Sequence, residues 1–322
     1  MKKESVGRTI WRVFYPVLIF LGVDIVISTV VTFGYTVYAT LQMGPQMELT
    51  AEAYAALTND VMNFIDSIAI YLTLIRSVLI IPFYIVFMRK DIKRDVEFGR
   101  PTEYTPYNKL WLLILPVMGV VMCLAFNNLV VMMMDLVEDG INALMDSMDI
   151  NYDFDAFASF EDSSSVIYSS HIVVQILVTS IAAPLVEELL FRGIVYKRLR
   201  TIMNITPAMI ISAALFGLVH GNMVQFVYAF LIGLIFAFVY EKFKTIWAPI
   251  ILHASANLLS VIITALSGSE TAEGSEGTIG MYMLFTVLEL AVTFLLVWLI
   301  DRKLNRTPLN QGNTDMNNDQ EA

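Results

Sequence analysis

The sequence is poor in cysteine and in charge. Its 322 residues include one cysteine, Cys123, which lies in an apolar run and excludes an intrachain disulfide. Only 16% of the residues are charged and 57% are hydrophobic, whereas soluble domains carry about a quarter charged residues. The alternating pattern of a membrane β-barrel is also absent. The composition therefore favours an all-α membrane protein, because only a helix satisfies its own backbone hydrogen bonds in lipid.

Long apolar runs recur along the chain, and each is long enough to cross about 30 Å of hydrocarbon as a helix. They predict a polytopic bundle of about eight transmembrane helices. The expected spans are Val13–Tyr38, Ile68–Met88, Leu110–Met134, Val166–Leu190, Ile202–Val219, Met223–Tyr240, Ile246–Leu266 and Ile279–Ile300. We expect residues 1–307 to form the helical membrane domain and the polar residues 308–322 to form a disordered tail.

Lysine and arginine are missing from every second connection between the runs. The connections without them are Leu41–Val61, Asp135–Ser165, Gly221–Asn222 and Ser267–Thr278. Because basic loops stay in the cytosol, this alternation predicts a cell-membrane protein with both termini cytosolic. The sequence pI of about 4.8 then reflects acidic outer loops. Basic loops beside an anionic leaflet indicate membrane lipids as partners and no nucleic acid.

Two adjacent glutamates follow Pro184 near the inner end of the fourth run. Glu188 and Arg192 are four residues apart and are expected to pair on one helix face. Glu187 is about 100° away around the helix and must face elsewhere. A carboxylate without a local partner in an apolar site can accept a proton near neutral pH. The alternative is an ion-pair cluster at a helix end.

Two of the three histidines lie in other apolar runs. His220 closes the fifth run, and His253 lies in the seventh, four residues before Asn257, so that His253 and Asn257 project to one side. A single histidine in an apolar helix is usually a packing residue. Two histidines together with Glu187 and Asn257, on three runs, favour one shared polar pocket. His171 lies about four turns from Glu187 and is left out.

These residues form an ordered set of motifs. Glu-Glu-x-x-x-Arg at Glu187, Glu188 and Arg192 precedes Phe-x-x-x-His, which ends at His220, and His-x-x-x-Asn, which begins at His253. In that order on successive apolar segments, they resemble the signature of the CAAX prenyl endopeptidase and bacteriocin-processing family of intramembrane proteases, also called CPBP or Abi. The resemblance covers about Val166–Leu266, which would be the protease core.

The resemblance implies a glutamate-dependent hydrolase without a cofactor. Glu187 would be the general base, His220 would help to hold or activate water, and His253 with Asn257 would stabilise the oxyanion. Glu188 and Arg192 would order the site through their ion pair. A zinc site made by Glu187, His220 and His253 remains an alternative, although no His-Glu-x-x-His helix is present.

The expected substrate is a peptide or the terminus of a membrane protein, because nothing in the sequence indicates a prenyl-binding site. Two other functions stay open. A non-catalytic membrane immunity or scaffold protein could share the fold, since the family includes bacteriocin-immunity members. A transporter could use Asp24, Asp66, Arg76 and Glu289, which lie in or near the runs, although these residues are more simply paired between helices.

The proposed pocket also sets a condition on the chain between the fifth and sixth runs. As straight spans, these runs would place His220 far from Glu187, near the opposite membrane surface. The two residues can meet only if a short hairpin turns inside the bundle, which Gly217 and Gly221 would allow. We therefore predict that the Gly221–Met223 turn is buried, beside a cavity that opens to the cytosol.

Overall fold

The computed structural model describes residues 5–43, 50–151, 154–168, 170–267, 279–304 and 306–309. Helices make up nearly all of this part of the chain. Most of the predicted disordered tail, from residue 310 onwards, and most of the predicted outer connection Ser267–Thr278 lie outside the described residues. The division into a membrane domain and a tail stays a prediction.

The helices follow one another with short connections. In chain order they are α1 (Val6–Met43), α2 (Ala51–Glu97), η1 (Lys109–Leu113), α3 (Ile114–Ser147), α4 (Ala158–Tyr168), α5 (Ile172–Gln175), η2 (Ile176–Ala182), α6 (Ala183–Glu188), η3 (Leu189–Tyr196), α7 (Lys197–Leu199), α8 (Ile205–Leu218), α9 (Met223–Phe243), α10 (Trp247–Ser267) and α11 (Ile279–Lys303). Segments η2 and η3 are π-helical, with a wider turn than an α-helix.

Seven helices of the described chain are long and apolar enough to cross a membrane. The segments from α5 to α7 count as one of them, because they continue each other over Ile172–Leu199. The predicted polytopic helical bundle is therefore confirmed, and the chain is a multi-pass membrane protein. The predicted fifth span is the exception, because α8 has 14 residues and reaches only about 21 Å.

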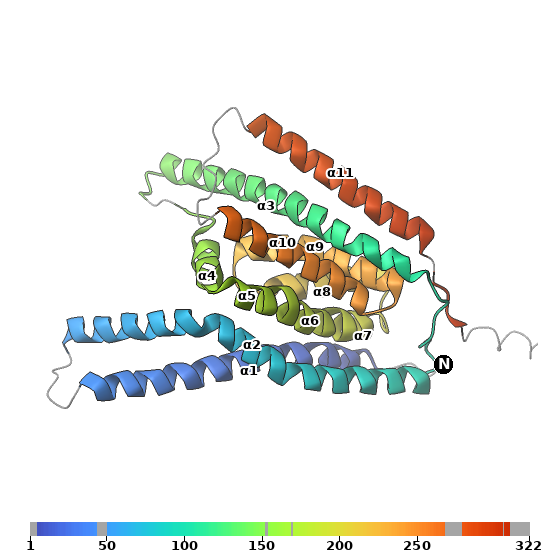
Figure 1. Cartoon of the computed structure of the whole chain (residues 1–322), viewed down its shortest axis with the longest axis horizontal. Coiled ribbons are helices and arrows are strands. Elements are labelled where there is room, and N and C mark those ends of the chain that lie inside the picture. The colour runs from blue at the N-terminus through green and yellow to red at the C-terminus, as the bar shows by residue number, and fades with distance from the viewer. Residues whose placement is uncertain are drawn as a thin grey trace, which may run out of the picture.

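The helices form three groups that lie side by side (Figure 1). The long antiparallel hairpin of α1 and α2 lies along one side of the molecule, and α3 with α11 lies along the other. Between them are the helices from α4 to α10, which hold most of the buried hydrophobic cluster. Both outer groups therefore cover a central unit that contains all the predicted motif residues.

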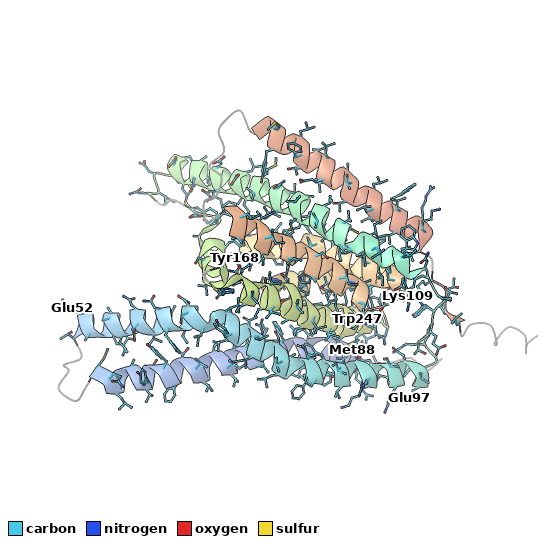
Figure 2. All side chains as sticks on the ribbon, in the orientation of Figure 1. Glu52, Met88, Glu97, Lys109, Tyr168 and Trp247 are labelled. Atoms are coloured by element: carbon cyan, nitrogen blue, oxygen red, sulfur yellow. The ribbon has the colours of Figure 1, made fainter. Side chains whose placement is uncertain are left out.

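One end of the bundle is rich in basic residues, because the last turns of α2 carry Arg89, Lys90, Lys93 and Arg94. Glu97 and Lys109, which flank the connection between α2 and α3, lie at this end of the molecule near the N-terminus, and Glu52 lies at the opposite end (Figure 2). At the first end, Arg306 donates a hydrogen bond of 2.6 Å from Nη1 to the carbonyl of Phe243, the last residue of α9. This contact ties the chain after α11 to the central unit.

Close helix crossings depend on glycine. A Cβ atom on Gly119 of α3 would lie 2.6 Å from the carbonyl oxygen of Leu252 in α10. On Gly217 of α8 it would lie 2.8 Å from the carbonyl oxygen of Phe226 in α9. Small residues of this kind let helix backbones approach closely in membranes.

The crossing of α3 and α10 gives a stability prediction. We expect Gly119→Ala to destabilise the purified protein by about 1–3 kcal/mol, because the added methyl group meets backbone rather than a flexible side chain. The matched control is Gly22→Ala in α1, where a Cβ would meet no atom within 4 Å. The apparent unfolding temperature in detergent measures both effects. An equal response of the two variants would contradict the close crossing.

Candidate active site

The centre of the site is the carboxylate of Glu188, at the end of α6. Its Oε1 atom accepts a hydrogen bond of 2.9 Å from Nη1 of Arg192 and one of 3.0 Å from Nδ1 of His253. The side chains of Glu188 and Arg192 are both 0% exposed. The pair predicted from the four-residue spacing is therefore present, and it also holds a histidine from α10.

Arg192 has partners at both terminal nitrogens of its guanidinium group, whereas its buried Nε atom has no hydrogen-bond partner among the described residues. Its Nη2 atom donates a 2.9 Å hydrogen bond to the carbonyl of Gly233 in α9. The group also lies 4.6 Å from the ring centroid of Phe216 and 5.1 Å from that of Phe236. A Cβ on Gly233 would lie 3.1 Å from Nη2, so any larger residue would crowd the guanidinium group. Such compensation is needed because burying charges without good partners costs several kcal/mol per ion.

His253 contacts both glutamates through its two ring nitrogens. Because a carboxylate only accepts, Nδ1 carries a proton and donates it to Glu188. The other nitrogen, Nε2, lies 3.8 Å from Oε2 of Glu187, whose side chain is 15% exposed. The imidazole also stacks on Phe236, with centroids 4.7 Å apart. The two glutamates thus face different directions, as expected, and still meet at one imidazole ring.

His220 contacts the ring of Phe216, which in turn contacts His253. The centroid of the buried Phe216 ring lies 5.0 Å from that of His220 and 5.7 Å from that of His253. Nδ1 of His220 lies 2.8 Å from the carbonyl oxygen of Phe216 and must donate to it, which leaves Nε2 as the acceptor of the neutral ring. His220 therefore lies one aromatic ring away from His253, with a nitrogen able to accept a proton.

The turn after His220 does not lie where the sequence analysis expected. Gly221 has a φ of +79°, a conformation that glycine adopts without strain. Gly221 is exposed and Met223 is 45% exposed, so the prediction of a buried turn is wrong. Burial resumes at Val224, which packs in a small cluster with residues before α4. The hairpin of α8 and α9 is short enough because α8 ends early, not because its turn is covered by the bundle.

Asn257 holds a backbone carbonyl in the π-helical segment. Its Nδ2 atom donates a 2.7 Å hydrogen bond to the carbonyl of Thr179. In η2 the N–H of Ala183 bonds to the carbonyl of Val178, five residues earlier. The next bond in this series would join Thr179 to residue 184, which is a proline without an N–H. Asn257 thus supplies the donor that Pro184 lacks, and its second amide N–H is not needed for this bond.

The candidate zinc ligands are not grouped as a metal site. Among the described residues, no three histidine, cysteine, aspartate or glutamate side chains come together in a way that could hold a metal ion. Glu187 and His253 are neighbours, whereas His220 and His253 each contact the ring of Phe216.

Several other candidates are paired between helices. Arg76 of α2 donates a 2.9 Å hydrogen bond to Asp24 of α1, and Asn128 of α3 donates a 3.1 Å bond to Glu289 of α11. These pairings support the structural interpretation of the charges in the spans rather than a transport path. His171 accepts a hydrogen bond from the N–H of Val173 at the start of α5 and stays outside the site.

Some residues of the site were missed by the sequence analysis. They are Thr179, Ser212, Gly233 and Phe236. Ser212 of α8 is fully buried and donates a 2.9 Å hydrogen bond to the carbonyl of Phe191 in η3. A glycine inside the apolar run of α9 was the one available signal, because glycine often marks a close backbone approach in membrane helices.

The comparisons with known proteins agree with the motifs. Residues 169–259 match the family model described as type II CAAX prenyl endopeptidase Rce1-like. A similar curated protein is "Putative membrane peptidase YdiL" of Bacillus subtilis (strain 168), which is 38% identical over 88 residues. The match covers 27% of this chain and 36% of that relative, so the chain spans about a third of the relative's length. No solved structure matches.

These findings confirm the resemblance to the CPBP family over the central unit of the fold. They support a CAAX-type protease fold for the matched segment. The matched segment runs from the end of α4 to α10 and includes every motif residue. The hairpin of α1 and α2, together with α3 and α11, lies outside it.

The contact between Asn257 and Thr179 gives a second prediction. We expect Asn257→Ala to lower the stability in detergent by about 1–2 kcal/mol, because it leaves the partly buried carbonyl of Thr179 without a donor. In a Pro184→Ala background the same change should cost about 1 kcal/mol less, since residue 184 then carries an N–H. The four proteins of this double-mutant cycle are compared by their unfolding temperatures. An equal cost in both backgrounds would show that Asn257 does not replace the missing N–H.

Proposed function

We propose that this chain is an intramembrane endopeptidase that hydrolyses a peptide bond with water activated by Glu187. The observation that carries the proposal is the arrangement at His253, whose two ring nitrogens lie 3.0 Å from Glu188 and 3.8 Å from Glu187. A buried ion pair fixes one nitrogen, and a partly exposed carboxylate faces the other. This is how a water-activating base and an oxyanion donor would be held side by side.

In the proposed reaction, Glu187 is the general base. Its carboxylate takes a proton from water while the water oxygen forms a bond to the carbonyl carbon of the substrate. The separation of 3.8 Å between Glu187 and His253 is longer than a hydrogen bond, so one small oxygen can contact both groups. The amine leaves when the tetrahedral intermediate collapses and receives the proton that Glu187 took. His220 would assist through Nε2, which accepts a hydrogen bond from water in the neutral ring.

The oxyanion would be stabilised by His253 and Asn257. Nδ1 of His253 already donates to Glu188, so Nε2 can donate to an oxyanion only when the ring carries both protons. The charged ring would lie between two carboxylates, with Arg192 balancing Glu188. Asn257 uses one amide N–H on Thr179 and would offer the second to the intermediate.

Glu188 and Arg192 are positioning residues in this proposal. They contact the backbone of α9 and the ring of His253, rather than the expected position of the substrate. We further propose that no metal is needed, which agrees with the separation of the three candidate ligands. The substrate class is a peptide or the terminus of a membrane protein. Both termini of this chain are cytosolic in this proposal, because the short α8 runs outward and α9 returns, which keeps the number of passes even.

The proposal is tested by comparing protein termini in cells that express the wild-type chain or Glu187→Gln. The amide keeps the size of the side chain but cannot take a proton, so at least about a 100-fold loss of cleavage is expected. Mass spectrometry of terminal peptides should find new termini only with the wild-type protein. A chelator should leave the cleavage by purified protein unchanged.

The matched control is Glu52→Gln, in the first turn of α2 at the far end of the bundle (Figure 2). It should cleave like the wild type at equal expression. Identical sets of termini from wild-type and Glu187→Gln cells would argue for a non-catalytic immunity or scaffold protein. Loss of cleavage with the chelator would instead favour the zinc alternative.

The orientation can be tested separately. Alkaline phosphatase fused after Lys303 should be inactive, because this enzyme folds only outside the cytosol, and a green fluorescent protein at the same place should fluoresce. The opposite result would overturn the placement of the basic end of the bundle in the cytosol. The test measures whether the fused reporter folds, so its outcome does not depend on peptide hydrolysis by this chain.

A further inference from the structure

A basic groove lies at the end of the bundle near the N-terminus, away from the candidate active site. Its volume is about 330 Å³, and it opens between the start of α1, the last turns of α2 and α7. The described lining residues are Arg12, Tyr15, Phe87, Lys90, Asp91, Lys93, Arg94, Glu97 and Arg198. Five of them are cations and two are acids.

The groove lies where three apolar helices leave the hydrocarbon. Arg12 comes directly before the apolar run of α1, and Lys90 follows the end of the run in α2 at Met88. Figure 2 shows Met88 and Glu97 along the part of α2 that reaches this end of the molecule. Trp11, 62% exposed on α1, is typical of the membrane interface. The charged lining residues therefore lie at the depth of the lipid headgroups.

Asp91 joins the helices that form the wall of the groove. The two carboxylate oxygens of Asp91 bind Arg12 and Arg198, and the latter contact is 2.7 Å long from Nε. Asp91 is 4% exposed, so this contact is a fixed part of the wall. The carboxylate of Asp91 is therefore paired with these two arginines. Lys90, Lys93 and Arg94 also line the groove, and Glu97 is the other acid among the described lining residues.

The inner side of the groove is aromatic. Tyr15 and Phe87 meet edge to face, with centroids 5.4 Å apart, and the guanidinium group of Arg198 lies 5.2 Å from the Tyr15 centroid. Both rings belong to the apolar runs of their helices, one turn inside the charged residues. The groove therefore changes from cationic to apolar in the direction of the membrane interior.

We propose that this groove binds the headgroup of an anionic phospholipid. Lys90 and Lys93 contact the phosphate, Arg12, Asp91 and Arg198 form the frame, and Tyr15 and Phe87 contact the glycerol and the first acyl carbons. Basic pockets between helices at the cytosolic surface take anionic lipids for this reason. A free phosphate would use only the cations, so the aromatic wall favours a lipid. The proposal does not depend on hydrolysis by the central unit.

The test uses the purified full chain in a neutral detergent. Native mass spectrometry counts bound lipid as phosphatidylglycerol, or phosphatidylcholine with the same acyl chains, is added. The wild type should bind phosphatidylglycerol saturably and more tightly than phosphatidylcholine. Lys90→Gln with Lys93→Gln should weaken the phosphatidylglycerol affinity about 30-fold, at about tenfold per 1.4 kcal/mol and about 1 kcal/mol for each lysine.

Two further variants make the result specific. Lys109→Gln with Lys303→Gln removes the same charge from exposed lysines at the same end of the bundle, outside the groove, and should bind phosphatidylglycerol like the wild type. Lys90→Arg with Lys93→Arg keeps the charge and should keep the affinity within a few fold. An equal loss of phosphatidylglycerol affinity in the Lys109 and Lys303 control would overturn the site, because it would show that only the net charge of the protein matters.

A competition experiment with inorganic phosphate distinguishes a lipid headgroup from a free phosphate as the ligand. Phosphate should compete poorly with phosphatidylglycerol, because it cannot use the aromatic wall. The proposal is overturned if phosphatidylglycerol binds no better than phosphatidylcholine, if the Lys90 and Lys93 variant binds like the wild type, or if phosphate binds as tightly as the lipid. The last result would identify an anion site without a lipid.

Discussion

The burial of the Glu188 carboxylate next to Arg192 constrains the whole central unit. Both side chains are 0% exposed, and removing such charges from water costs several kcal/mol for each ion unless other groups compensate. The compensation comes from three other helices. The carbonyl of Gly233 in α9 accepts a hydrogen bond from Arg192, and the ring of Phe216 in α8 lies against its guanidinium group. His253 of α10 donates a hydrogen bond to Glu188. The ion pair therefore positions these helices around it.

The backbone near this pair departs from α-helical geometry, and side chains make up for the missing hydrogen bonds. Two π-helical segments, η2 and η3, flank the glutamates, and π-helical turns are frequent at functional sites. Asn257 binds the carbonyl that Pro184 leaves without a donor, and Ser212 binds the carbonyl of Phe191. Polar side chains on neighbouring helices thus join the wide turns to the rest of the bundle by hydrogen bonds to their backbone carbonyls.

Outside the central unit, charged residues connect helices. Asp24 and Arg76 join α1 to α2, Lys197 binds Asp95 at 2.8 Å and so joins α7 to α2, and Asn128 with Glu289 joins α3 to α11. The first and third contacts hold the two helices of each outer group together, and the ion pair of Lys197 with Asp95 attaches the hairpin of α1 and α2 to the central unit. Both outer groups lie outside the segment that resembles CAAX-type proteases. The basic groove is built from the same kind of contact, since Asp91 links Arg12 of α1 to Arg198 of α7.

The sequence by itself determined the helical membrane bundle, seven of the eight predicted spans and the pairing of Glu188 with Arg192, whereas the short length of α8 appeared only in the structure. Length, apolarity and four-residue spacing are local properties that do not depend on which helices become neighbours. Only the tertiary structure decided that His253 donates to Glu188 and faces Glu187, that Asn257 binds Thr179, and that the turn at Gly221 is exposed. Those contacts depend on the rotation and depth of separate helices and on the wide turns of η2 and η3. Hydrophobicity does not encode these features, because an apolar run of the same composition fits several registers.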